Sequence, residues 1–161
     1  MDFATPKDFL EVINKWFNGL IALPLLAVSY GYLEIHSGRI EPILVSSLYL
    51  NMAIIVLVMI SVILVSLKYR KSIGRINKVD ALKVRLVDYF FKSKSYYVSI
   101  LISSLLTAIL LFVTANSFYA GLYAFQLFAL SIHKPSMLAV ANRLNLKGEE
   151  RANFLTKELL N

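Results

Sequence analysis

The chain has 161 residues, a formal net charge of +7 and 58% hydrophobic residues, whereas charged residues make up only 17%. A soluble domain has about 45–50% apolar and about 25% charged residues, so this composition excludes an ordinary soluble globular protein and favours a membrane protein. The absence of cysteine excludes disulfides and thiolate metal sites.

The first segment, residues 1–16, predicts a short amphipathic helix. Thr5 is suited to the N-cap and Pro6 to the first helical position, and Trp16 would lie at the level of the lipid headgroups. The apolar run that follows, residues 17–33, predicts a membrane span. A cleaved signal peptide is the alternative, but the acidic residues before the run do not form a basic n-region, which favours a retained span.

Two longer uncharged runs follow. Residues 43–67 come after a short polar loop and predict a second span, which at about 1.5 Å per residue is longer than a hydrocarbon core of about 30 Å. The run 96–132 is too long for one span, and Asn116 lies near its middle. We therefore predict a tight hairpin of two spans, 96–114 and 117–132.

The stretch between the second and third spans, residues 68–94, is strongly basic. Apolar residues recur at helical spacing over about residues 75–91, which predicts an amphipathic helix lying on the inner leaflet. Its basic side chains would contact anionic lipids. These residues are Arg75, Lys78, Lys83, Arg85 and Lys92. The alternative is that these charges only determine the topology.

Lysine and arginine are distributed unequally among the loops. The basic stretch and the C-terminal tail hold many of them, whereas the loop after the first span holds only Arg39 and the hairpin turn holds none. Because positively charged loops stay in the cytoplasm, we predict that both termini are cytoplasmic and that the membrane is the plasma (cell inner) membrane. Tyr69, Tyr96 and Tyr97 would then mark the inner lipid boundary together with Trp16.

Residues 1–135 are predicted to form the membrane domain, and residues 136–161 a helical cytoplasmic tail. The second of two short tail helices would start near Gly148, where acidic residues favour a helix N-terminus. Each tail helix has an apolar face, and we predict that these faces dock on a protein partner. The residues of this docking face are Met137, Val140, Leu144, Leu155 and Leu159.

Three polar side chains lie deep in the predicted spans, namely Asn51, Thr107 and Gln126. Counted from the outer ends of their spans, they lie at similar depth, near the middle of the bilayer. Because an unpaired amide is costly there, we predict that they form one polar layer bonded across helices. The alternative is that each amide bonds to the backbone of its own helix.

No pattern in the chain is typical of a catalytic site. The predicted spans contain no charged residue, which argues against a proton- or ion-coupled transporter. His36 lies near Glu34 and Glu41, but their spacing is better explained by loop polarity than by metal binding. We therefore predict no catalytic residue, no cofactor and no metal site.

Together these patterns predict an all-α, four-span transmembrane helical bundle with an amphipathic cytoplasmic loop helix and a helical tail. We interpret the protein as a non-enzymatic subunit or docking factor of a membrane complex, which presents a basic cytoplasmic face. Its expected partners are anionic lipids and either a second copy or a larger membrane protein, but not nucleic acid. A homo-oligomeric channel or transporter is the alternative, and a membrane enzyme acting through its cytoplasmic loop is a weaker one.

Overall fold

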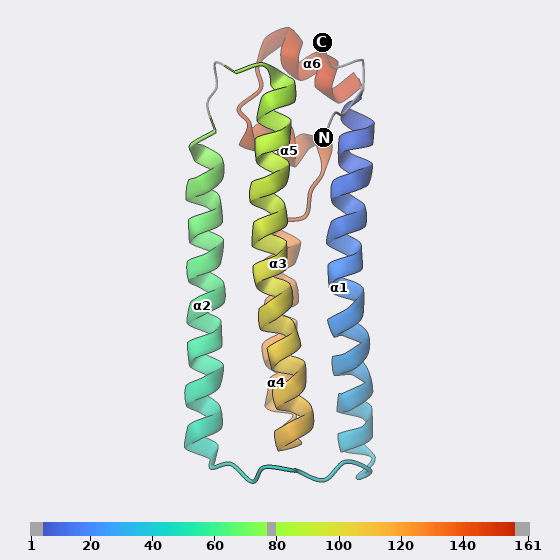
Figure 1. Ribbon diagram of the computed structural model, residues 1–161, viewed down its shortest axis with the longest axis vertical. Coiled ribbons are helices and arrows are strands. Elements are labelled where there is room, and N and C mark those ends of the chain that lie inside the picture. Colours follow the sequence, from blue (N-terminus) through green and yellow to red (C-terminus); the bar gives the residue numbers. More distant parts are fainter. Residues whose placement is uncertain (1–4, 77–79, 157–161) are drawn as a thin grey trace.

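The computed structural model describes residues 5–76 and 80–156, and the regular elements in these ranges are all helices. They are α1 (Pro6–His36), α2 (Leu48–Gly74), α3 (Leu82–Thr114), α4 (Phe118–Ile132), α5 (Met137–Arg143) and α6 (Gly148–Thr156). The first four form an antiparallel bundle in which α3 packs against α1, α2 and α4 (Figure 1). The short helices α5 and α6 lie at one end of this bundle.

Within residues 5–76 and 80–156, three helices are long and apolar enough to cross a membrane. They are α1, α2 and α3, with 31, 27 and 33 residues, and at about 1.5 Å per residue each exceeds a hydrocarbon core of about 30 Å. The fourth helix, α4, is apolar but has only 15 residues. The all-α class is therefore confirmed, and the bundle contains three helices of spanning length and a shorter fourth rather than four clear spans.

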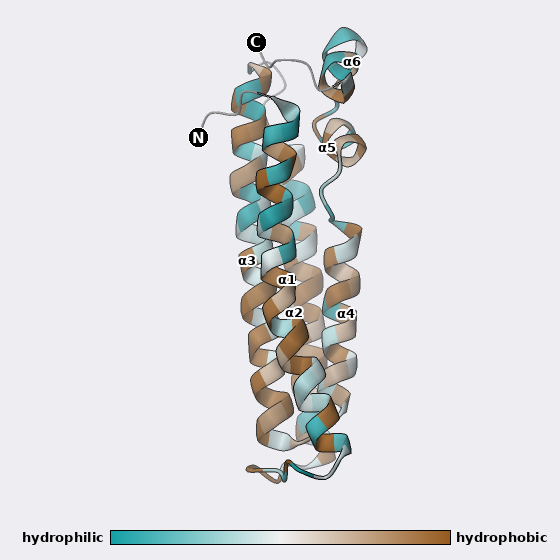
Figure 2. Cartoon of the chain, turned by 90° about the vertical axis from the view of Figure 1, so that its right-hand side faces the viewer, coloured by the Kyte–Doolittle hydropathy of each residue, from teal (hydrophilic) through white to brown (hydrophobic). Residues whose placement is uncertain are grey.

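Hydropathy divides the bundle along its long axis (Figure 2). Hydrophobic residues cover most of the part that lies beside α4, whereas hydrophilic residues are frequent on the ends of the long helices near α5 and α6. We call this second end the tail end. The opposite end, which carries the loop 37–47 and the turn 115–117, is the loop end. The basic stretch lies at the tail end because α2 ends there and α3 begins there.

The start of α1 is confirmed. The Thr5 Oγ1 accepts a hydrogen bond from the Asp8 backbone N–H (3.2 Å), the Asp8 carboxylate accepts one from the Thr5 N–H (3.0 Å), and Pro6 follows the cap. The helix continues without a break into the apolar run, so no separate amphipathic helix precedes it. Its first turns pack against α3, where the ring of Phe9 lies edge-on to Tyr89 at 6.1 Å.

The second long helix starts and ends later than the predicted span 43–67. The backbone N–H groups of Ile43 and Leu44 both donate to the Val113 carbonyl, at 3.0 and 2.9 Å, so this segment satisfies an otherwise unpaired carbonyl at the end of α3. Ser47 then caps α2 by accepting a hydrogen bond from the Leu50 N–H (3.3 Å).

The interfacial helix predicted over residues 75–91 is not a separate element in the described part of this range, which leaves out residues 77–79. α3 is continuous over Leu82–Thr114 and contains neither glycine nor proline, so nothing in the sequence separates a surface helix from the apolar run. The apolar side of its first turns is buried in the core, with Leu86 at 0% and Phe90 at 2% exposure. This side therefore contacts protein instead of lipid, and the helix runs along the bundle (Figure 1).

The predicted hairpin between the last two bundle helices is confirmed. α3 ends at Thr114, and Ala115 adopts a left-handed backbone conformation with φ of 48°, which stops the helix. The Asn116 Oδ1 accepts a hydrogen bond from the Phe118 N–H (3.0 Å) at the start of α4.

Both predicted tail helices are present, but two residues of the predicted docking face, Val140 and Leu144, are buried inside the chain. Val140 and Leu144 are 0% and 3% exposed, and Phe154 of α6 is fully buried, all within the chain's own core. Met137 is half-buried, Leu155 is exposed, and Leu159 lies outside the described residues. The tail covers the tail end of its own bundle, so Val140, Leu144 and Phe154 are not available to a partner, whereas Leu155 remains exposed.

Candidate functional site

A group of buried polar side chains lies at the tail end, where α2, α3, α5 and the end of α4 meet. We call it the tyrosine–histidine cluster, and it consists of Ser66, Tyr69, Tyr89, Ser93, Tyr96, Tyr97, His133 and Arg143. Four of these residues come from α3 because positions 89, 93, 96 and 97 share one face of a helix. All but the half-buried Ser66 and Arg143 are inaccessible to solvent.

Arg143 joins the tail to the bundle. Its guanidinium donates to the last carbonyls of α4, with Nη2 at 3.1 Å from the Ile132 oxygen and Nη1 at 3.4 Å from the His133 oxygen. The Nη1 also donates to the Tyr89 hydroxyl at 3.0 Å. A cation at this position satisfies unpaired carbonyls and interacts favourably with the helix dipole. The contact therefore holds α5 against the end of α4.

The tyrosines connect α2 to α3. The Tyr69 hydroxyl lies 2.9 Å from the Ser93 Oγ, and its ring stacks on that of Tyr96 at 4.5 Å. The Tyr96 hydroxyl lies 3.2 Å from the Ser66 Oγ. Buried hydroxyl groups that all have partners fix the relative rotation of the helices that carry them.

His133 lies at the centre of the cluster and is 4% exposed. Its Nδ1 lies 2.9 Å from the Ala129 carbonyl, which can only accept, so Nδ1 carries the hydrogen. Its Nε2 is buried without a hydrogen-bond partner. Burial lowers the pKa of His133, and the charges of Arg143 and Arg70 lower it further. The ring is therefore neutral at neutral pH, and Nε2 is a free hydrogen-bond acceptor.

A second contact between tail and bundle is an ion pair. The Arg85 Nη1 lies 2.7 Å from a carboxylate oxygen of Glu150, and the Arg85 Nη2 donates to the Leu144 carbonyl. The side chain of Arg85 is 5% exposed, whereas that of Glu150 is 38% exposed. One arginine of α3 thus binds both the end of α5 and the first turn of α6.

The predicted membrane-surface cations do not form one open patch. Arg85 is buried in the ion pair above, Lys92 bonds to Asp88 at 2.7 Å, and Lys83 is half-buried. Lys78 lies outside the described residues. Exposed cations at the tail end include a row along the last turns of α2, Lys68, Arg70, Lys71 and Arg75, and they also include Lys7, Lys134 and Lys147.

Two of the three residues of the predicted polar layer meet. Gln126 of α4 is fully buried, and its Nε2 donates to the Thr107 Oγ1 at 2.9 Å and to the Ser103 Oγ at 3.0 Å. Thr107 in turn donates to the Ser103 carbonyl at 3.0 Å. This part of the layer bonds across α3 and α4, as predicted, rather than only within one helix.

Asn51 does not belong to that layer. Because α2 begins at Leu48, Asn51 lies in its first turn at the loop end, and its Oδ1 accepts hydrogen bonds from Tyr119 and Ser46, both at 2.9 Å. Tyr119 precedes Gln126 by two helical turns, which is about 10 Å along α4. The prediction of one polar layer is therefore wrong in this respect. Among the described residues, Asn51 bonds to Tyr119 near the loop end, and Gln126 bonds to Thr107 at a different depth.

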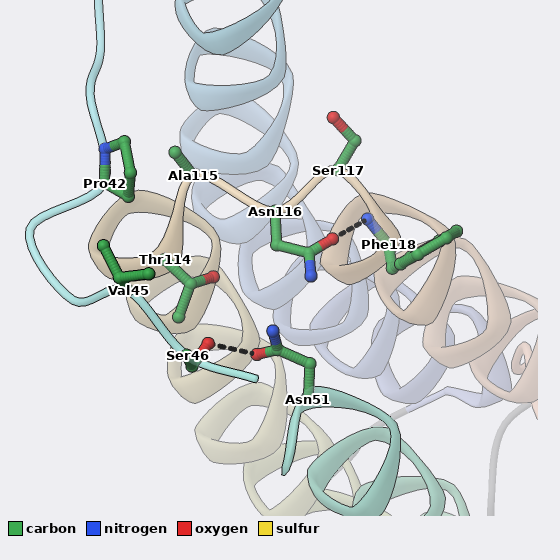
Figure 3. A pocket seen from close by; sticks show the side chains of 9 residues that line it. All are labelled: Pro42, Val45, Ser46, Asn51, Thr114, Ala115, Asn116, Ser117 and Phe118. Carbon is green, nitrogen blue, oxygen red and sulfur yellow. Dashed lines mark hydrogen bonds between the residues drawn. The ribbon is translucent and has the colours of Figure 1, made fainter. Parts of the chain in front are cut away.

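A pocket of about 400 Å³ opens beside Asn51 at the loop end. It lies between the segment before α2 and the turn after α3, and the amides of Asn51 and Asn116 point toward one another across it (Figure 3). The acceptor oxygens of both amides are already bonded within the chain, to Ser46 and to the Phe118 N–H. The pocket therefore presents amide and hydroxyl groups but no charge.

The tyrosine–histidine cluster was not predicted from the sequence. Tyr69, Tyr96 and Tyr97 were expected at the lipid boundary, yet they face the interior of the bundle at 4%, 3% and 1% exposure. A signal was present in the helical spacing of hydroxyl side chains at the start of α3. The residues that these side chains meet, His133 and Arg143, lie far along the chain, so spacing alone could not pair them.

Comparisons with known proteins do not place this chain in a family. No protein-family model matches it, and no curated protein and no solved structure is significantly similar to it. In residues 5–76 and 80–156, no group of three or more His, Asp or Glu side chains is arranged to hold a metal ion. We therefore infer the function from the geometry of the polar clusters and the exposed surfaces.

Proposed function

We propose that the protein is a multi-pass integral membrane protein and a non-enzymatic subunit of a membrane complex. The observation that carries this proposal is how the tyrosine–histidine cluster is bonded. Arg143, His133 and the tyrosines bond to each other, to serines and to helix carbonyls, and together they hold the tail against the bundle. This arrangement favours a rigid structural unit over a site that binds and converts a substrate.

We include α4 among the membrane spans. It carries no charge, it follows α3 after a tight turn, and it returns antiparallel to α3 toward the tail end. At about 22 Å it is shorter than the core of an average bilayer, but local thinning of the bilayer accommodates such a mismatch. The hydrophilic ends of α1, α2 and α3 then project into the cytoplasm, where α5 and α6 pack against them.

The proposed orientation can be tested with single cysteines, because the chain has none of its own. We expect Glu41→Cys at the loop end to react with an impermeant maleimide added to intact cells. Lys147→Cys at the tail end should react only after permeabilisation, because the exposed cations at that end keep it in the cytoplasm. Reaction of both positions from the same side would contradict the proposal that α4 is a span, because three spans, α2, α3 and α4, would then not separate the two positions.

The surface favours assembly within the membrane. The most apolar 18-residue stretch of α2 has a mean hydropathy of 2.8, and most of the apolar side chains of α2 are exposed, including Leu57 at 66% and Leu64 at 59%. The interior between the helices is instead filled by fully buried side chains such as Leu111, Tyr119 and Gln126. A conducting path through a single chain is therefore not favoured. The exposed surface fits lipid and the helices of a second subunit.

Native mass measurement after extraction in mild detergent tests the subunit role. We expect a discrete complex that contains a second polypeptide. The control is an extract from cells in which the gene for that polypeptide is deleted, and the complex should be absent there. A homo-oligomer that conducts ions in liposomes would instead support the channel alternative, with the path lying between copies.

A further inference from the structure

A groove of about 240 Å³ lies between α2 and α4 near the tail end. Its walls are apolar, and several of them are open to the outside, with Ile63, Leu67 and Phe128 at 47%, 56% and 65% exposure. In a membrane this opening would face acyl chains. The groove is therefore shaped to take part of an apolar chain from the side.

Three polar residues line this groove, and one of them, Ser66, already bonds to the Val62 carbonyl and lies 3.2 Å from the Tyr96 hydroxyl. The other two are Arg70 and His133. Arg70 follows the uncharged part of α2, is exposed, and makes no ion pair with any described residue. His133 also lines the groove, and its Nε2 is the buried nitrogen that lacks a partner. An unpaired polar atom in such a place is costly, so a ligand that bonds to it would be stabilised.

The chemistry of these two groups defines the ligand. The Arg70 guanidinium matches a phosphate, to which it can donate two parallel hydrogen bonds. The neutral His133 ring accepts at Nε2, so its partner must carry a hydrogen, as a hydroxyl group does. An apolar chain, an anionic phosphate and a hydroxyl group occur together in one class of molecule, the anionic phospholipids with a hydroxylated headgroup.

We propose that this groove binds one such phospholipid. Its phosphate lies at Arg70, a headgroup hydroxyl donates to the His133 Nε2, and part of an acyl chain lies between α2 and α4. This site rests on the proposed placement of the protein in a membrane. It goes beyond a general attraction between the basic cytoplasmic face and anionic lipids, because it assigns specific contacts to one lipid. The lipid would bridge α2 to the end of α4 at the same point where Arg143 holds the tail.

A neighbouring cavity between α2 and α3 is less suited to bind an anionic lipid than this groove. That cavity, of about 180 Å³, is also lined by cations, Lys68 and Lys92. However, Lys92 is already paired with Asp88, and the Tyr69 and Tyr96 hydroxyls that line it have partners within the chain. Among the described residues that line this cavity, none has a buried polar atom without a partner, whereas His133, which lines the groove between α2 and α4, has such an atom in its Nε2.

The experiment measures lipid binding to the delipidated full chain by native mass spectrometry. The probes are phosphatidylglycerol, phosphatidylmethanol, which has the same charge but no hydroxyl group, phosphatidylcholine, and free glycerol phosphate. We expect phosphatidylglycerol to bind best, and Arg70→Gln to weaken its binding at least about tenfold. Lys71→Gln is the matched control, because it removes the neighbouring exposed charge and should change binding less than about twofold.

A second variant tests the apolar part of the site. Ile63→Trp keeps both polar groups but fills the groove, and it should also weaken phosphatidylglycerol binding.

Equal losses of binding in Arg70→Gln and Lys71→Gln would overturn the proposal in favour of general attraction to anionic lipid. Equal binding of phosphatidylmethanol would exclude the contact with His133. Binding of glycerol phosphate as tight as that of the lipid would exclude the groove as an acyl-chain site. Whether the chain is a subunit of a larger complex does not affect any of these outcomes.

Discussion

Replacement of Phe154 by alanine is expected to release α6 from the bundle. Phe154 is 0% exposed and lies in the hydrophobic core. Truncation of a buried phenylalanine costs about 3–5 kcal/mol, because apolar area is lost and a cavity remains. Every 1.4 kcal/mol is about a factor of ten, so hydrogen exchange of the α6 amides should become about 100-fold faster or more.

The adjacent residue gives the control for this prediction. Leu155 lies on the same helix and is 37% exposed, so Leu155→Ala should leave the exchange of α6 nearly unchanged. The exchange of amides in the middle of α3 should stay slow in both variants, because the core there does not depend on α6. If Phe154→Ala and Leu155→Ala have equal effects, α6 is not held by burial of Phe154.

Replacement of Glu150 by alanine is expected to weaken the packing of α5 and α6 against the bundle, because it removes the carboxylate that pairs with Arg85. The change leaves the buried Arg85 without its carboxylate, although the guanidinium keeps the Leu144 carbonyl as a partner. Loss of one partner of a fully buried pair costs about 3–5 kcal/mol, and the partial exposure of Glu150 reduces our expectation to about 2 kcal/mol. Hydrogen exchange of the amides in α5 and α6 should therefore become about 30-fold faster.

Two further variants separate the ion pair from other effects of the acidic residue. Glu149→Ala removes the neighbouring exposed carboxylate from the same first turn, so it reports the helix-dipole contribution alone, which is below about 1 kcal/mol. Arg85→Met combined with Glu150→Ala should cost less than the sum of the two single changes, because no unpaired buried charge remains. Additive effects would show that the two side chains do not interact.

The sequence determined the elements of the bundle because their signals are local. Uncharged apolar runs predicted the long helices, Thr5 and Pro6 predicted the start of α1, and Asn116 marked the turn between α3 and α4. Each of these signals acts within one or two helical turns, through capping bonds, backbone conformation and the cost of burying charge. They can therefore be read without knowing which helices are neighbours.

Helix boundaries were less well determined where two signals competed. The uncharged residues 43–47 extended the predicted second span, but the N–H groups of Ile43 and Leu44 bond to the Val113 carbonyl of α3 instead of continuing a helix. The position of Asn51 in the bundle changed accordingly, from the middle of the bilayer to the loop end. Only Gln126 and Thr107 were brought together as predicted, because the ends of their helices at the hairpin turn were predicted correctly.

The tertiary structure alone decided what covers each apolar face. An amphipathic face at the start of α3 or in the tail can be buried by lipid, by a partner or by the same chain. The spacing of its apolar residues along the sequence is the same in all three cases. Here the tail and the start of α1 cover the start of α3, which buries Arg85, the tyrosines and His133 together. Contacts between residues more than fifty positions apart, such as Arg143 with Tyr89 and Glu150 with Arg85, depend on that packing and leave no periodic trace in the sequence.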